Sequence, residues 1–311
     1  MEPTNNITWP ELSYADLKDT LATVHMWAQI VGKIRLKKMP WTNHSWHVTL
    51  EISPSGFSTG SIPYQSGVFQ IEFDFINDLL LITASSGKRE EMKLYARSVA
   101  SFYNELFEKL HSAGIEVEIY AIPNEVDPAI PFAKDETHRS YNHGQMVLFW
   151  QALVMIRNAF TKFRAKFIGK CSPVHLFWGA FDLAVTRFSG RTAPLHPGGA
   201  PNMPDKVMQE SYSHEVSSCG FWVGNDQFPQ PAFYSYCYPT PENFSKQRVK
   251  PAEAFYSAEM GEFLLNYDLV QRSTDPEMVL LEFLQSTYEA AATISKWDRA
   301  RLEFDFSSFE K

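Results

Sequence analysis

The sequence is poor in cysteine and has neither a long apolar run nor a long basic run. Only 3 of its 311 residues are cysteines, which does not fit a small secreted fold held together by disulfides. No run of about 18 apolar residues occurs, so neither a membrane-spanning helix nor membrane association is expected. The first residues lack the basic and apolar segments of a secretory leader. Together these features predict a reduced, cytoplasmic protein.

The charge of the chain and its lack of nucleotide-binding motifs limit the expected partners. The formal net charge is −8, and the densest basic run, residues 32–38, is short, so no nucleic-acid partner is expected. No GxGxxG fingerprint, P-loop or kinase signature occurs, so a nucleotide cofactor is not supported. The sequence leaves the cofactor unknown and the oligomeric state open.

Aromatic residues, in contrast, are abundant. The chain has 24 Phe, 13 Tyr and 8 Trp, which together make up 14% of it. This excess has two interpretations. It is typical of a core built from strands and aromatic-rich helices. It also fits aromatic walls around a ligand pocket.

The hydrophobic pattern predicts an α+β fold with mostly antiparallel sheets and packing helices. Gly32 is expected to end the first helix, and Asp275 with Pro276 to begin the last. Apolar residues at helical spacing indicate helices at residues 11–31, 97–113, 145–168 and 276–295. Strand patterns occur at residues 46–52, 69–75, 115–122, 213–224, 232–239 and 261–270.

The pattern occurs twice, which suggests two similar α+β halves and an internal duplication. Each half contains, in order, a helix, a Gly-Lys pair, a proline, a histidine, strands and a second helix. We divide the chain into an N-terminal half (1–124), a Pro-rich acidic connection (125–143) and a C-terminal half (144–311). The alternatives are a chance similarity of two ordinary halves and one continuous domain.

The stretch VHLFWGAFDLAVTRFSGR, residues 174–191, combines a strand pattern with polar residues. Alternation along a strand places Asp182 on one face and Arg187 on the other. Both faces are mostly apolar, which is typical of a central strand covered on both sides, with a bend at Gly179. Asp182 lies in the middle and must be paired or hydrogen-bonded if it is buried. Asp182 and Trp178 are therefore candidate ligand-binding residues on a polar pocket floor. The alternative is a salt-bridged core strand.

Two arginines lie at the end of this stretch. Arg187 and Arg191 flank the tripeptide FSG, whose glycine would turn the chain and bring both guanidinium groups toward one anion. Arginine suits carboxylates and phosphates because its planar group donates two parallel hydrogen bonds. The following segment, residues 192–218, is long and rich in Pro and Gly, and we interpret it as a lid over the arginine pair.

Histidines supply candidate acid–base groups and metal ligands. His175 and His214 are candidate catalytic residues, because imidazole titrates near neutral pH. The segment HEVSSC does not match the zincin helix motif, which has a second histidine four residues after the first. A metal site would need three or four converging side chains, for which the candidates are His175, His196, His214, Glu215 and Cys219.

Several long strings of the sequence resemble one uncharacterised family. GKCSPVHLFWGAFDLAVTRFSGR, followed by YSHEVSSCGFW, is similar to the mainly bacterial family of domain of unknown function 5996. The resemblance extends from WPELSYADLKDT through GKIRL and NHSWHVTL to FLQSTYEAAA, nearly the whole chain. Val223 departs from the family pattern, which has proline there. The resemblance implies no activity, substrate or cofactor. It implies that SPVHLFWG, TRFSGR and SHEVSS belong to a shared scaffold or site.

The sequence supports three hypotheses about function. The first is a protein, an enzyme or not, that binds a small anionic metabolite in a His- and Arg-lined cleft. The second is a metal-dependent hydrolase. The third is a non-catalytic structural or interaction protein in which the same residues form buried salt bridges. A pocket with unpaired His and Arg side chains would favour the first hypothesis, and a cluster of three metal ligands the second. Complete pairing of the charges, with no cavity, would favour the third.

Overall fold

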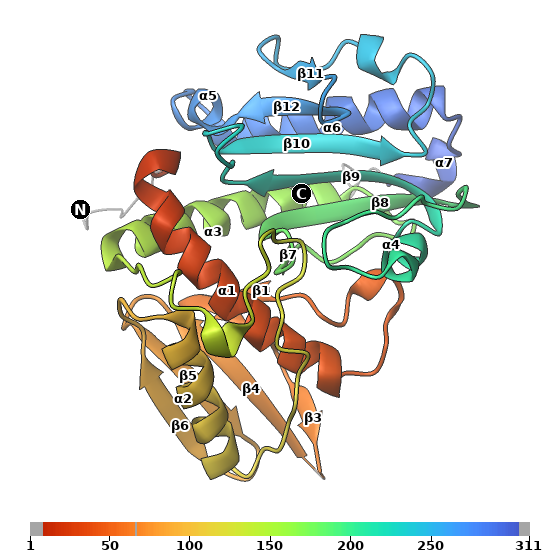
Figure 1. Ribbon diagram of the computed structural model, residues 1–311. Coiled ribbons are helices and arrows are strands. Elements are labelled where there is room, and N and C mark those ends of the chain that lie inside the picture. The colour runs from red at the N-terminus through yellow and green to blue at the C-terminus, as the bar shows by residue number, and fades with distance from the viewer. Residues whose placement is uncertain (1–8, 66, 305–311) are drawn as a thin grey trace, which may run out of the picture.

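The computed structural model describes residues 9–65 and 67–304, and these residues form two antiparallel sheets with helices packed on them (Figure 1). The predicted α+β class is therefore confirmed. The first eight residues, part of the segment that lacks a secretory leader pattern, lie outside the described residues. Buried apolar side chains from both halves of the chain belong to one continuous cluster.

The N-terminal sheet is an antiparallel meander with the order β1-β2-β4-β5-β6. Strands β2 and β3 both pair with β4, β2 along its last residues and β3 along its first. Its strands are β1 Glu51–Ile52, β2 Gly56–Ser58, β3 Ile62–Tyr64, β4 Gly67–Asp74, β5 Leu79–Ala84 and β6 Arg89–Lys93.

The C-terminal sheet has the order β11-β12-β10-β9-β8-β7. Its strands are β7 His175–Phe177, β8 Asp182–Thr192, β9 His214–Trp222, β10 Ala232–Tyr238, β11 Phe255–Ser257 and β12 Glu262–Asn266. Because β12 rather than β11 pairs with β10, the strand order differs from the meander of the first sheet. The internal duplication is not confirmed.

Helices cover one face of the C-terminal sheet and separate the two sheets. Helices α3 and α6 pack on each other and on β8, β9 and β10, while α1 contacts α2 and α3. Figure 1 shows α1 crossing the middle of the molecule between the two sheets. The helices are α1 Tyr14–Lys38, α2 Val99–Ser112, α3 His143–Ala165, α4 Asp205–Ser211, α5 Tyr267–Gln271, α6 Pro276–Ile294 and α7 Arg299–Leu302. No helix in these described ranges is both long and apolar enough to cross a membrane.

The ends of the first helix differ from the prediction. Ser13 is the N-cap, and its hydroxyl accepts a hydrogen bond from the Asp16 amide at 3.4 Å. The helix continues through Gly32 to Lys38. A Cβ atom at Gly32 would lie 2.1 Å from Cδ1 of Trp178, so this glycine allows close packing of the indole instead of ending the helix.

Four predicted strands also differ from the structure. Residues 261–270 form a strand only over Glu262–Asn266, and the chain then enters helix α5 at Tyr267. Residues 46–52 form a strand only at Glu51–Ile52, because the chain is turned by His44 and Ser45, both with φ of 58°. Residues 115–122 form no strand. Residues 174–191 are not one bent strand: β7 and β8 are separate antiparallel strands, with Phe177 paired to Asp182. The turn between them includes Phe181 with φ of 61°.

Candidate functional site

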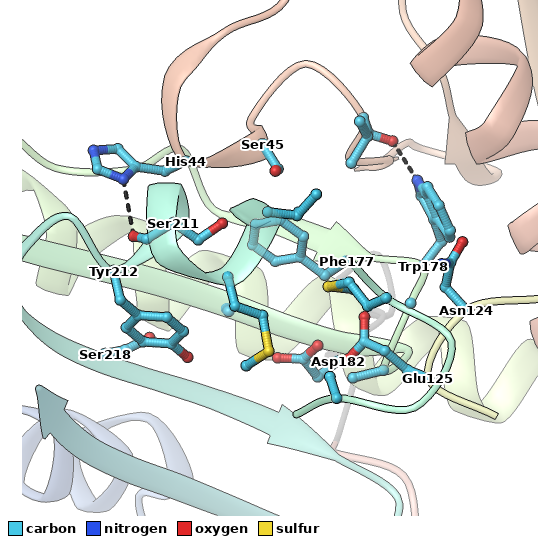
Figure 2. Close-up of a pocket in the computed structure, with 18 of the residues that line it drawn as sticks. His44, Ser45, Asn124, Glu125, Phe177, Trp178, Asp182, Ser211, Tyr212 and Ser218 are labelled. Carbon is cyan, nitrogen blue, oxygen red and sulfur yellow. Dashed lines mark hydrogen bonds between the residues drawn. The ribbon is translucent and has the colours of Figure 1, made fainter. Parts of the chain in front are cut away.

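A pocket of about 1000 Å³ lies where segments of both halves meet. Its walls come from the end of α1, the segment around residues 41–48, the connection at residues 120–125, and the face of the C-terminal sheet opposite α3 and α6. Figure 2 shows residues from these elements pointing into one space. Many aromatic side chains belong to the lining: Trp41, Trp46, Tyr120, Phe177, Trp178, Phe188, Tyr212, Trp222, Tyr234 and Tyr236.

The strands of the C-terminal sheet divide their residues between this pocket and the helices. Side chains alternate between the two faces of a strand. Pairing in register places residues of β8, β9 and β10 in rows, such as Thr186, Ser218 and Tyr236. These even-numbered residues line the pocket, whereas their odd-numbered neighbours, such as Val185 and Phe233, are buried below α3 and α6.

Asp182 lies in the pocket wall and is bound by a tyrosine from two strands away. The Tyr234 hydroxyl on β10 donates a short hydrogen bond to Oδ2 of Asp182 on β8, so the phenol ring passes over β9. Gly220 of β9 makes this possible, since a Cβ there would lie 2.3 Å from the Tyr234 hydroxyl oxygen. Burial raises the pKa of Asp182 to about 6.

Glu125 places a second carboxyl group beside Asp182 (Figure 2). Its side chain lies against Gly179 in the turn between β7 and β8. Its backbone has φ of 58°, and its amide donates a 2.8 Å hydrogen bond to the Pro201 carbonyl. Burial, and then the nearby charge of Asp182, raise the pKa of Glu125 to about 7.

Glu262, at the start of β12, is the third carboxyl group in the wall. Burial and the charge of Asp182 raise its pKa to about 7 as well. Over residues 9–65 and 67–304, none of Glu125, Asp182 and Glu262 forms an ion pair with Lys, Arg or His. Three carboxyl groups therefore line one aromatic pocket without an ion-pair partner among the described residues.

Hydroxyl groups occupy the sheet face next to these carboxyl groups. The hydroxyl groups of Tyr212 and Tyr236 lie 2.7 Å apart, and those of Thr186 and Ser218 lie 2.8 Å apart. In each pair one hydroxyl group donates to the other, so the second hydroxyl keeps its own proton for a further hydrogen bond. They give the floor of the pocket hydrogen-bonding capacity without adding charge.

Lys33 of α1 is a basic residue in the same lining. The residue is only 3% exposed, and its Nζ lies 5.5 Å from the ring centroid of Trp178 and 5.6 Å from that of Tyr120. The ammonium donates a short hydrogen bond to Oδ1 of Asn124. Burial lowers the pKa of Lys33 to about 8.

The predicted lid segment covers this pocket and not the arginine pair. Lining residues from the part of the segment before β9 are Ala200, Asn202, Met203, Pro204, Val207, Met208, Ser211 and Tyr212. One end is fixed by His44, whose amide donates to both carboxylate oxygens of Glu210 and whose Nδ1 donates to the Ser211 carbonyl at 2.9 Å (Figure 2). Nε2 of His44 then accepts a 2.5 Å hydrogen bond from Lys170. The other end is fixed by the Pro201–Glu125 hydrogen bond.

Unusual backbone conformations surround the pocket. Left-handed φ values of 54° to 61° occur at His44, Ser45, Glu125, Phe181 and Asn202. Four of these residues line the pocket, and Phe181 directly precedes Asp182. Such conformations cost energy for residues with a side chain and are concentrated at functional sites.

The two predicted anion-binding arginines lie outside the pocket and apart from each other. Arg187 faces α3 and α6, where its guanidinium carbon lies 3.5 Å from the ring centroid of Phe163 and 4.3 Å from that of Tyr288. Arg191 pairs with Glu215 at 2.7 Å and donates to the Ser295 carbonyl at the end of α6. Both side chains serve contacts within the fold. Of the predicted ligand-binding residues, Trp178 and Asp182 do line the pocket.

The predicted histidines do not share a site with each other. His175 is 2% exposed, its two ring nitrogens have no hydrogen-bond partner in the described chain, and burial lowers its pKa to about 3. Nδ1 of His214 lies 3.1 Å from the Ser213 hydroxyl oxygen, and the ring centroids of His214 and His44 lie 6.0 Å apart. The ring of His196 stacks on that of Tyr212, with 4.5 Å between the ring centroids. None of the three lines the pocket.

The candidate metal ligands do not converge either. Glu215 is paired with Arg191, and the buried thiol of Cys219 donates to the Val185 carbonyl at 3.6 Å. Within the part of the chain that the structure describes, no three His, Cys, Asp or Glu side chains are grouped to hold a metal ion. The geometry therefore does not support the predicted set of ligands.

Sequence reasoning missed several residues of this pocket. Glu125 falls in the acidic connection that we assigned to a boundary, and Lys33 in a short basic run. One available signal was the alternation of Tyr234 and Tyr236 in AFYSYCYP, which places both tyrosines on one face of a strand. No sequence signal connects Glu125, Asp182 and Glu262, because they lie far apart in the chain.

Comparison with known proteins agrees with the resemblance seen in the sequence. The model of a family described only as a family of unknown function, DUF5996, matches residues 9–304. No curated protein and no solved structure matches the chain. All of the pocket residues described above fall within the matched range.

Proposed function

The chain belongs to this family of unknown function, and we propose that its pocket binds a small organic cation with an apolar body. One observation carries the proposal. Glu125, Asp182 and Glu262 line one aromatic pocket, and none of them forms an ion pair with a described basic residue. Buried carboxylates are costly unless they are paired, so a positively charged ligand would stabilise the site.

The chemistry of the walls fits such a ligand. An ammonium group donates charge-assisted hydrogen bonds to carboxylates, and the faces of Trp and Tyr rings attract cations. The pocket volume of about 1000 Å³ accommodates a body much larger than the ammonium group. The aromatic residues would contact this apolar body, while the hydroxyl groups of the floor would orient it.

This proposal differs from the small anion expected from the sequence. That expectation depends on Arg187 and Arg191, whose guanidinium groups contact aromatic rings, carbonyl oxygens and Glu215 outside the pocket. The excess of carboxyl groups over basic groups in the lining favours a cation. Binding would lower the pKa values of the carboxyl groups, so it would release protons and strengthen as the pH rises through about 7.

The test compares three ligands that share one apolar body: phenethylamine, phenethyl alcohol and hydrocinnamate. Isothermal titration calorimetry near pH 8 is expected to show that the amine binds at least about tenfold more tightly than the alcohol or the acid. Asp182→Asn should remove most of this preference. Glu108→Gln, which changes an exposed carboxyl group on α2, is the matched control and should leave it unchanged.

Two results would contradict the proposal. One is absence of amine binding to the unaltered protein. The other is equal binding of the amine and the alcohol, since the carboxyl groups would then contribute nothing to recognition.

A further inference from the structure

Lys33 carries a positive charge that the fold does not neutralise. It is 3% exposed, and it forms no ion pair among residues 9–65 and 67–304. Its hydrogen-bond partner, Oδ1 of Asn124, is a neutral amide oxygen, and its other neighbours are the rings of Trp178 and Tyr120. An ammonium group in such surroundings lacks the anion that normally accompanies a buried charge.

The pocket contains carboxyl groups, but the structure keeps them from pairing with Lys33. Asn124 is bound to Lys33, whereas the next residue, Glu125, directs its carboxyl group to Gly179 and the side of Asp182. The left-handed backbone of Glu125, with φ of 58°, separates the two neighbouring side chains. The amide of Asn124 is held in place as well, because its backbone N–H donates to Oε1 of Gln29 at 2.8 Å.

The same pocket therefore presents an unpaired ammonium group and a group of unpaired carboxyl groups at separate places in its wall. Trp178 and Gly179, consecutive in the chain, contact the two kinds of charge: the indole lies by Lys33, and Gly179 lies by Glu125. A ligand with a single positive charge would satisfy only the carboxyl groups. A ligand with both charges would satisfy both.

We infer that the ligand of this pocket is a zwitterion, an amino acid-like molecule whose ammonium group meets Glu125, Asp182 and Glu262 and whose carboxylate meets Lys33. This inference rests on the proposed function, and it adds the second charge and the residue that recognises it. The aromatic walls indicate that an apolar body accompanies the two charged groups.

The test uses zwitterions with matched singly charged analogues. Phenylalanine is compared with phenethylamine and hydrocinnamate. To cover a wider charge separation, para-(aminomethyl)phenylacetate is compared with para-methylbenzylamine and para-tolylacetate. In calorimetric titrations near neutral pH, at least one zwitterion is expected to bind about tenfold or more tightly than its matched amine.

Two lysine variants assign the effect to Lys33. Lys33→Met keeps a long apolar side chain and should reduce zwitterion affinity to that of the matched amine, while amine affinity does not fall. Lys37→Met, at an exposed position of the same helix, should change neither affinity. Thermal unfolding and circular dichroism of both variants establish that they are folded before the titrations. Lys33→Gln provides a second, polar replacement should the Met variant not fold.

The outcomes separate this inference from the proposed function. If the amines bind but neither zwitterion binds more tightly, the inference is wrong and the cation proposal stands. If the zwitterion is preferred but Lys33→Met and Lys33→Gln retain the preference, Lys33 is not the group that recognises the carboxylate, and the inference is again wrong. If the amines do not bind, the proposed function fails and the inference fails with it.

Discussion

The two faces of the C-terminal sheet place their charged groups in different surroundings. On the face toward α3 and α6, the guanidinium group of Arg187 is enclosed by aromatic rings and donates to the Phe163 carbonyl. On the other face, Asp182 and the nearby Glu125 and Glu262 have no positive partner in the described chain. The first face encloses its charge between aromatic rings and helices, where no ligand of the pocket can reach it. The second face presents its carboxyl groups to the pocket, where the proposed ligand would bind.

The comparison also explains why one strand holds both a carboxyl group that lines the pocket and an arginine that is buried under the helices. Asp182 and Arg187 belong to the same strand, β8, but they differ in parity and therefore point to opposite faces. Asp182 lines the pocket, whereas Arg187 lies under the helices and is not accessible from it. Mutations on the two faces should consequently affect different properties: stability on the helix side, and binding and its pH dependence on the pocket side.

The largest expected effect is on the helix side. Arg187→Ala should lower the free energy of unfolding by about 3–5 kcal/mol, because it removes a fully buried side chain and the contacts of its guanidinium group with Phe163 and Tyr288. Urea denaturation measures this change. Arg191→Ala is the matched control and should cost about 1 kcal/mol or less, since that ion pair is half exposed. If the two variants lost equal amounts of unfolding free energy, the distinction between a buried Arg187 and a partly exposed Arg191 would be wrong.

A smaller effect is expected from the pocket carboxyl groups, and it has a defined pH dependence. Their folded-state pKa values, about 6 for Asp182 and about 7 for Glu125 and Glu262, are raised by burial above the ordinary values of 3.8 and 4.5. Between these values the folded state holds protons that the unfolded state has released. The stability that this provides is present below about pH 4 and is lost as the pH rises through about 7.

The double variant Glu125→Gln/Glu262→Gln should therefore be more stable than the unaltered protein near pH 8, by about 1–2 kcal/mol per residue, and nearly equal to it near pH 4. Urea denaturation at several pH values checks this difference. The same variant should lose amine binding, so stability and binding would change in opposite directions. A loss of stability near pH 8 would instead assign these carboxyl groups a structural role.

The smallest effect is expected at the hydrogen bond between Tyr234 and Asp182. Tyr234→Phe removes a donor to the carboxylate, so the pKa of Asp182 should rise further, with a stability change of less than about 1.5 kcal/mol. NMR titration of labelled aspartate carboxyl carbons would measure the pKa. Tyr238→Phe, which removes a hydroxyl group bound to the Pro194 carbonyl, is the control. An unchanged titration of Asp182 in the Tyr234 variant would show that the tyrosine does not stabilise its charge.

The sequence was informative where a local pattern acts over many residues. The four main helices and the strands β4, β9 and β10 follow the predicted periodicity, and Asp275 with Pro276 begins α6 as predicted. The sequence did not predict the strand bounds where a few residues turn the chain. The turn at Phe181 divides the expected long strand into β7 and β8. The turn that begins at the left-handed His44 and Ser45 continues through residue 48, where the strand at 46–52 was expected. A hydrophobic pattern does not reveal such turn positions, because it depends on side-chain polarity and not on backbone conformation.

By itself, the sequence determined the α+β class, the family, and the fact that Asp182 and Arg187 point to opposite sides of a strand. These follow from periodicities and strings that are local in the chain. Only the tertiary structure decided which side is covered by helices and which faces a pocket. It also decided that Lys33, Glu125 and Glu262 join Asp182 there. The reason is that charge pairing depends on distance in space, and these four residues come from four distant segments that meet only when the two halves pack together.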